Sequence, residues 1–141
     1  MIRIDTAAFG QAIEQKKREL EEMARPVAQA GAQVLYERAR ALAPVSEGNA
    51  HWFYGRGGRK YGPFAPGTLR RSIYQAYARS KSSAAYAEYH ISWNPQKAPY
   101  GGMVEFGTSK ATAHSFIGRA IAETRGQVTD AMKTKFAELA K

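Results

Sequence analysis

The segment that decides the fold reads YGGMVEFGTSKATAHSF, residues 100–116. Its beginning has the apolar spacing of a short helix over 100–106, because side chains three and four residues apart share one helix face. That spacing is carried by Tyr100, Met103, Val104 and Gly107. Gly107 ends the helix, since glycine adopts positive φ at a helix C-terminus without steric cost. The last turn therefore holds an acid, Glu105, between two apolar neighbours.

A long helix is predicted on the C-terminal side of this segment, from about residue 115 onward. Its apolar stripe consists of Phe116, Ile117, Ile121, Val128, Met132, Phe136 and Leu139. On the N-terminal side, IYQAYA (residues 73–78) and AYAEYHISW (residues 85–93) predict an antiparallel strand pair. Tyr89, Ile91 and Trp93 alternate with polar residues, so we expect their face to pack against the terminal helix.

The first part of the sequence predicts a short strand over residues 1–5 and then a long helical segment. Asp5 or Thr6 is the expected N-cap. The apolar positions at helical spacing are Phe9, Ile13, Leu20, Met23, Val27, Val34 and Leu42. Pro26 lies inside this pattern, and proline removes one backbone donor and clashes with the preceding turn. We therefore expect a kink or break near Pro26 and two helical pieces.

Residues 46–67 show little periodicity and are rich in glycine, proline and aromatic residues, so they predict an extended loop or arm. The sequence as a whole predicts one α+β domain over residues 1–141. It comprises a long N-terminal helical segment kinked near Pro26, an antiparallel β-hairpin or small sheet, a short helix and a long C-terminal helix.

The charge is unevenly distributed. Among 141 residues, 21 Lys and Arg face 12 Asp and Glu, a net charge of +9. Between Glu47 and Glu88 there is no acid, and the bases there are Arg56, Arg59, Lys60, Arg70, Arg71, Arg79 and Lys81. A basic surface of this kind suits a polyanion or an acidic protein partner. No apolar run approaches the ~20 residues of a membrane span, and no signal peptide is recognisable, so we expect no membrane partner.

The basic band is interleaved with aromatic residues, which favours a contact surface over a merely solvated face. The candidate interface residues are Trp52, Phe53, Tyr54, Arg56, Arg59, Lys60, Arg70 and Arg71. Arginine beside aromatic side chains is typical of protein interface hot spots. It is equally typical of grooves that bind single-stranded nucleic acid. The residues alone leave these two interpretations open.

No catalytic constellation is recognisable. The three histidines, His51, His90 and His114, lie in different predicted elements without the spacing of metal ligands. There is no cysteine, no nucleophile elbow and no phosphate-binding loop. We therefore expect no enzyme, no metal and no cofactor.

The segment YGGMVEFGTSKATAHSFIGRA resembles the C-terminal signature of a family of tailed-phage head–tail joining proteins. These are neck or tail-completion proteins of the gene-product-ten type, found in siphophages like HK-ninety-seven. ARALAPV followed by PGTLRRSI resembles a second signature of the same family. Prolines are usual in the family where Thr112 and Ser115 stand, so the exit from the short helix is less stiff here. The resemblance covers about residues 6–140, with the motifs in the family's order.

The resemblance implies a structural virion protein at the head–tail connector or tail end, present in the host cytoplasm during assembly. It implies a homo-oligomeric ring, hexameric or dodecameric, which contacts portal-side connector proteins and tail-terminator or tail-tube proteins. Contact with DNA in the channel is a further expectation. The alternative from the residues themselves is a non-catalytic, basic nucleic-acid-binding module.

The resemblance also gives the opening segment the role of a structural joint. Val104 and Phe106 are expected to anchor the short helix in the core, and Thr108 or Ser109 to hydrogen-bond nearby backbone after the glycine at 107. Glu105 has two open roles. It could reach the domain edge and pair with an arginine of the same or a neighbouring subunit, or it could cap backbone donors locally.

Overall fold

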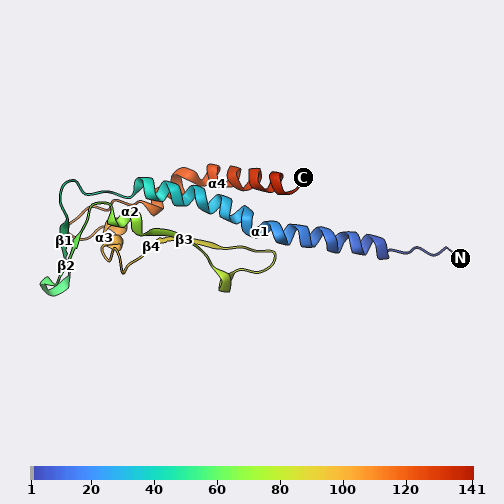
Figure 1. Ribbon diagram of the computed structural model, residues 1–141, viewed down its shortest axis with the longest axis horizontal. Helices are drawn as coiled ribbons and strands as arrows, with labels where there is room; N and C mark the ends of the chain where they lie inside the picture. Colours follow the sequence, from blue (N-terminus) through green and yellow to red (C-terminus); the bar gives the residue numbers. More distant parts are fainter. Residues whose placement is uncertain (1) are drawn as a thin grey trace.

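The computed structural model describes residues 2–141 as an elongated α+β molecule, which confirms the predicted fold class (Figure 1). The elements are α1 (Ala7–Leu42), β1 (His51–Tyr54), β2 (Lys60–Phe64), α2 (Thr68–Ser72), β3 (Ile73–Tyr77), β4 (Tyr89–Trp93), α3 (Gly101–Phe106) and α4 (Ile117–Leu139). Short 3₁₀ turns lie at Arg56–Gly58 and Arg79–Lys81. The start of α1 forms one end of the molecule, and the β1–β2 hairpin lies at the other.

Helix α1 is one continuous helix of 36 residues with Pro26 inside it, so the predicted division into two pieces is wrong. Proline removes only its own N–H from the hydrogen-bond ladder, and packing against α4 supports the helix around it. Residues 2–5 form no strand, because no neighbouring strand is available to pair with them. Thr6 holds the N-cap position without a side-chain bond, while Asp5 accepts the N–H of Ala7 at 2.9 Å.

Helices α1 and α4 run antiparallel and meet through small residues. A Cβ added to Gly31 would lie 2.8 Å from the Met132 side chain, which shows how closely the helices approach. On α4 the buried positions are Ala120 and Thr124, and the Thr124 hydroxyl donates to the Ala120 carbonyl. The predicted apolar stripe of α4 is confirmed in part: Phe116 is buried and Val128 and Met132 pack against Gly31, whereas Ile121, Phe136 and Leu139 are exposed.

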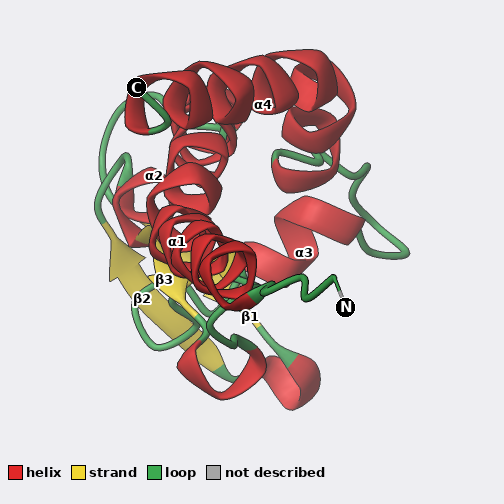
Figure 2. Cartoon of the chain, turned by 90° about the vertical axis from the view of Figure 1, so that its right-hand side faces the viewer, coloured by secondary structure: helices red, strands yellow, loops and turns green. Residues whose placement is uncertain are grey.

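Strands β3 and β4 pair antiparallel, as predicted, with Ile73 opposite Trp93 and Tyr77 opposite Tyr89. They pack mainly against α1, which lies between them and α4 (Figure 2). The expected packing of this strand face on the terminal helix is thus only local. Ile91 lies in a hollow lined by side chains of both helices, and the Trp93 ring meets Phe116, which precedes α4, at 5.7 Å.

Residues 46–67 do not form an irregular loop; β1 and β2 within them make a second antiparallel hairpin. His51 pairs with Phe64 and Tyr54 with Lys60, with a register shift near the start of β1. The hairpin packs on the same core as the rest of the chain. That core is built around Ala39, Ala43, Leu69, Ile73, Ala98, Tyr100, Phe116 and Ala120.

Candidate functional site

The inner face of the β1–β2 hairpin is fixed to the core by Tyr100. The Phe53 ring stacks on the Tyr100 ring with centroids 4.1 Å apart and planes within 9°. Phe64 meets the same ring edge-on at 4.9 Å, and His51 at 5.9 Å. Phe53 was predicted as an interface residue, and the structure shows that it contributes to internal packing instead. Strand alternation explains this, because residues 51 and 53 must share one face.

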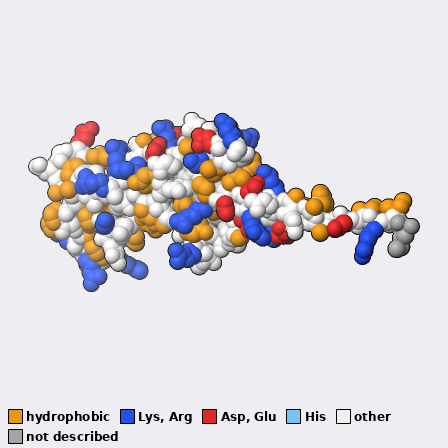
Figure 3. All heavy atoms as spheres, turned by 45° about the vertical axis from the view of Figure 1, so that its right-hand side comes forward, with side chains coloured by type: hydrophobic (Ala, Val, Ile, Leu, Met, Phe, Trp, Pro, Cys, Tyr) orange, Lys and Arg blue, Asp and Glu red, His pale blue; other side chains and the backbone are white. Residues whose placement is uncertain are grey.

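The outer face of the same hairpin is exposed. We call Trp52, Tyr54, Arg56, Arg59 and Lys60 together the outer hairpin face; Tyr61 pairs with Phe53 and so belongs to the inner side. The Lys60 ammonium lies 4.0 Å from the centroid of the Trp52 ring, a cation–π contact. Figure 3 shows Lys and Arg side chains gathered at the end of the molecule opposite the N-terminus. Two predicted aromatic residues and three predicted cations are therefore brought together on one exposed surface.

Arg70 and Arg71 make hydrogen bonds within the subunit, and the Arg71 side chain stays exposed. The Arg70 guanidinium donates to the carbonyl oxygens of Ala43 at 3.1 Å and Ala41 at 3.4 Å. A cation at this position satisfies carbonyls left free where α1 ends. Arg71 donates to the Pro66 carbonyl at 3.2 Å. The two residues predicted as interface cations thus hold α2 against α1 and against the loop that precedes it.

Glu105 is buried and caps the start of α4. Its carboxylate accepts the backbone N–H groups of Phe116 at 2.8 Å and of Ile117 and Gly118 at 3.0 Å. It also accepts the Ser115 hydroxyl at 2.8 Å. Burial raises the pKa of Glu105, but these four donors outweigh it and hold the pKa below its ordinary value. Of the two roles that the sequence left open, the structure shows the local cap, and no ion pair within residues 2–141 involves Glu105.

The other residues of the joint divide between core and solvent. Val104 packs against the core, but Phe106 is 78 % exposed, so its predicted anchoring role is wrong. Two residues along a helix lie about 200° apart, and both cannot face the same side. Gly107 has φ +75°, as predicted, with an extended ψ of 178°. The Thr108 hydroxyl accepts the N–H of Ala111 at 3.0 Å, which confirms its predicted bond to nearby backbone.

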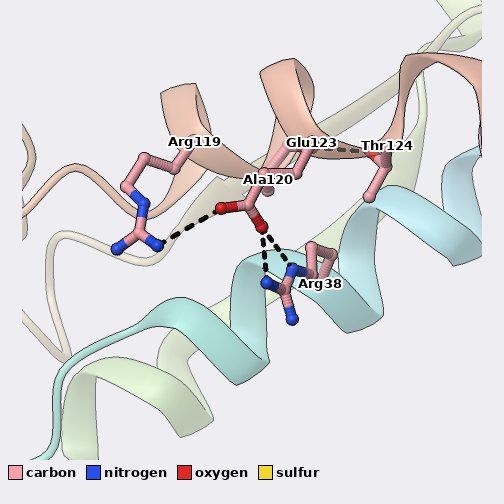
Figure 4. Close-up of polar contacts among 5 residues, drawn as sticks. All are labelled: Arg38, Arg119, Ala120, Glu123 and Thr124. Atoms are coloured by element: carbon pink, nitrogen blue, oxygen red, sulfur yellow. Dashed lines mark hydrogen bonds and ion pairs between the residues drawn. The ribbon is translucent and has the colours of Figure 1, made fainter.

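An ion-pair cluster joins α1 and α4 and was not predicted. The Arg38 guanidinium donates to Glu123, with its Nε 2.7 Å from the carboxylate, and Arg119 donates to the other oxygen at 3.2 Å (Figure 4). The Arg38 bond holds the pKa of Glu123 below its ordinary value. The i, i+4 spacing of Arg119 and Glu123 is visible in the sequence, whereas the 85-residue separation of Arg38 and Glu123 carries no local signal.

A hollow of about 250 Å³ lies beneath the hairpin, between Val45, His51, Tyr100 and His114. The Ser46 hydroxyl is 3.1 Å from His51 Nδ1, but no carboxylate lines this hollow. Within residues 2–141 no three His, Cys, Asp or Glu side chains are grouped to hold a metal ion. The feature of this region that a partner could recognise is the outer hairpin face, with its exposed aromatic rings and cations.

Comparison of the chain with protein-family models, with curated proteins and with solved structures finds no match. In the part of the chain that the structure describes, no helix combines the length and apolar character that crossing a membrane requires. A functional assignment therefore depends on the chain's own motifs, surfaces and charges.

Proposed function

We propose that this protein is a structural subunit of the ring that joins a phage head to its tail, or that completes the tail before joining. The observation that carries the proposal is the presence of large apolar side chains, exposed, at both ends of one elongated subunit. Contiguous apolar patches on a soluble protein mark surfaces that another protein covers. A subunit with two such ends suits repeated contacts between copies.

The joint between α3 and α4 supports the same proposal. The motif that resembles the head–tail joining family, residues 100–116, contains the helix end, the positive-φ glycine and the buried cap Glu105. Each of these features has a structural purpose and none requires a substrate. The segment is thus a joint that orients α4, which agrees with a structural role for the protein.

The proposed partners follow from that role. Copies of this chain form the ring through head-to-tail contacts. The ring closes because the rotation from each copy to the next adds up to a full turn. Neighbouring rings on the portal side and on the tail side cover the remaining apolar surface, and DNA passes through the channel. The site of action is the head–tail junction or the tail end of the virion, after assembly in the host cytoplasm.

The proposal is tested by deleting the gene from the phage or prophage that carries it. Full heads and complete tails should then accumulate unjoined in electron micrographs of the lysate. Adding the purified protein to that lysate should restore infectious particles. A matched control adds the Phe53→Ala variant, which is expected to fold poorly. Normal infectious particles from the deleted phage would contradict the proposal.

A second candidate, a nucleic-acid-binding module, is favoured by the outer hairpin face, where Trp52 and Tyr54 stand beside three cations. It predicts that the protein alone binds single-stranded or duplex DNA, with affinity falling steeply between 50 and 200 mM salt, as is usual for contacts with phosphates. Fluorescence anisotropy with a labelled oligonucleotide measures this. A ring subunit without DNA-binding activity would show neither strong binding nor a steep salt slope.

A further inference from the structure

The N-terminal part of α1 carries an apolar surface that the rest of the described chain leaves largely uncovered. Ala85 borders it beside Ile13 and Leu20, and the C-terminal Lys141 lies near Lys16 and Glu19 on another side of the helix. Helix α4 ends at Leu139, beside Met23 and Pro26, and α1 continues beyond it (Figure 1). We call residues 5–22 the projecting segment. Its apolar side chains Phe9, Ile13 and Leu20 are 69 %, 50 % and 46 % exposed. They lie within about 40° of one another around the helix, so they form one stripe.

The projecting segment is also the acidic part of a basic chain. It holds five acids and three bases, a net charge of −2, whereas the whole chain carries +9. Glu14 and Glu21 are seven residues apart and lie on the same side of the apolar stripe, further around the helix than Lys17, which borders the stripe itself. Neither makes an ion pair within residues 2–141, while Lys16 on the other flank is already paired with Glu19 at 3.1 Å.

The outer hairpin face has the complementary character. It presents exposed aromatic rings and three cations, and residues 48–87 around it contain no acid. It lies at the opposite end of the molecule from the projecting segment. Because the two surfaces are different and far apart, a contact between them joins copies head to tail.

We infer that the occupant of the projecting segment is the outer hairpin face of a second copy of this chain. Phe9, Ile13 and Leu20 of one copy pack against the aromatic rings of the next. Glu14 and Glu21 meet Arg56, Arg59 and Lys60 across the same contact, which sets the orientation of the two copies. The inference rests on the proposed function only in placing this contact within a phage ring. The contact itself can be measured with the purified protein alone.

Reciprocal charge reversal tests the contact in the purified protein. One variant carries Arg56→Glu, Arg59→Glu and Lys60→Glu, so that its hairpin and its projecting segment are both acidic. The other carries Glu14→Lys and Glu21→Lys, so that both of its surfaces are basic. Each variant alone should lose the oligomer and scatter light as a 15.5 kDa monomer. An equimolar mixture should recover the wild-type mass, because each surface then meets one of opposite charge.

Two matched controls carry the same changes in charge elsewhere on the exposed surface. They are Arg79→Glu with Lys110→Glu and Lys133→Glu, and Glu47→Lys with Asp130→Lys. Both should keep the wild-type mass, and circular dichroism melting should show that all four variants fold.

Three outcomes would overturn the inference. Wild-type protein that stays monomeric at all concentrations leaves no contact between copies. An oligomer that survives the hairpin reversal indicates that projecting segments pair with each other. Variants that lose assembly without recovering it on mixing show that the two surfaces do not meet. If the mixture reassembles but particles still form without the gene, the contact stands and the proposed function fails.

Discussion

The Glu105 carboxylate accepts the backbone N–H of Gly118, 13 residues further along the chain, at 3.0 Å. The same group accepts the N–H groups of Phe116 and Ile117. A helix begins with backbone donors that have no partner inside the helix, and it carries partial positive charge there. One side chain at the end of α3 thus satisfies the first turn of α4 and fixes the angle between the two helices.

Replacing this cap should destabilise the whole domain. Glu105→Ala leaves buried N–H groups without an acceptor and is expected to lower the free energy of unfolding by about 2 kcal/mol. The urea midpoint, followed by circular dichroism, measures the effect. Glu138→Ala is the control, since Glu138 makes only an exposed pair with Lys135 and should change stability by less than about 0.5 kcal/mol. Equal midpoints for the two variants would show that the start of α4 is held by something else.

The same carboxylate predicts how stability depends on pH. The folded pKa of Glu105 is lowered from 4.5, so folding favours the ionised form. Its contribution is therefore complete above pH 4.5 and is lost as the pH falls through the folded pKa. The difference in unfolding free energy between wild type and Glu105→Gln should stay constant from pH 7 to about pH 5 and narrow below that. A difference that is flat down to pH 3 would argue against ionised Glu105 as the cap.

Two glycines should respond to alanine in opposite directions. At Gly107 φ is +75°, and an added Cβ would lie 2.8 Å from the backbone nitrogen of Ala113. Gly107→Ala is therefore expected to cost at least about 1 kcal/mol. Gly126 lies inside α4 with open space around it, so Gly126→Ala should stabilise the protein by up to about 1 kcal/mol. Thermal melting of both variants against wild type measures the two signs, and a Gly107→Ala variant that is as stable as wild type would refute the assigned backbone at residue 107.

The two faces of the β1–β2 hairpin should separate stability from assembly. Phe53→Ala removes the ring stacked on Tyr100 and is expected to cost about 3 kcal/mol. Trp52→Ala, on the outer face, should cost less than about 1 kcal/mol and yet weaken assembly. Deleting residues 50–64 removes both faces, so it should lower the melting temperature as well. Chemical denaturation and light scattering on the same samples distinguish these effects.

The two long helices, α1 and α4, could be predicted because each carries a long pattern of period 3.6. The hairpin at residues 51–64 could not, since its strands are only four and five residues long and are interrupted by glycine and proline. The buried face of α4 was predicted only in part. Val128 and Met132 of the predicted stripe do pack against Gly31 of α1, but the buried positions nearer the start of α4 are the small residues Ala120 and Thr124, which a pattern of large apolar residues does not reveal.

The candidate site was predicted in part. Composition alone pointed to Trp52, Tyr54 and the three hairpin cations, which the fold does bring to one surface. Composition could not distinguish these cations from Arg70 and Arg71, which donate hydrogen bonds to carbonyl oxygens of the same subunit. Which carbonyls lie near a guanidinium is decided by the fold. For Glu105, the sequence did hold a usable signal. Neighbouring residues of a helix lie about 100° apart, so Glu105 and the exposed Phe106 had to point in different directions.

The projecting segment has a thermodynamic consequence. The projecting segment has few tertiary contacts, and a helix with little tertiary packing is only marginally stable in water, so in the free subunit these turns open at little cost in free energy. If a neighbouring copy covers the segment, its ordering and the joining of subunits become a single event. Each pairwise contact is then weakened by the entropy of ordering, and misplaced subunits can dissociate before a ring closes. Amide hydrogen exchange over residues 9–20 should accordingly be fast in the monomer and slow in the assembly, with no such change in the second half of α1.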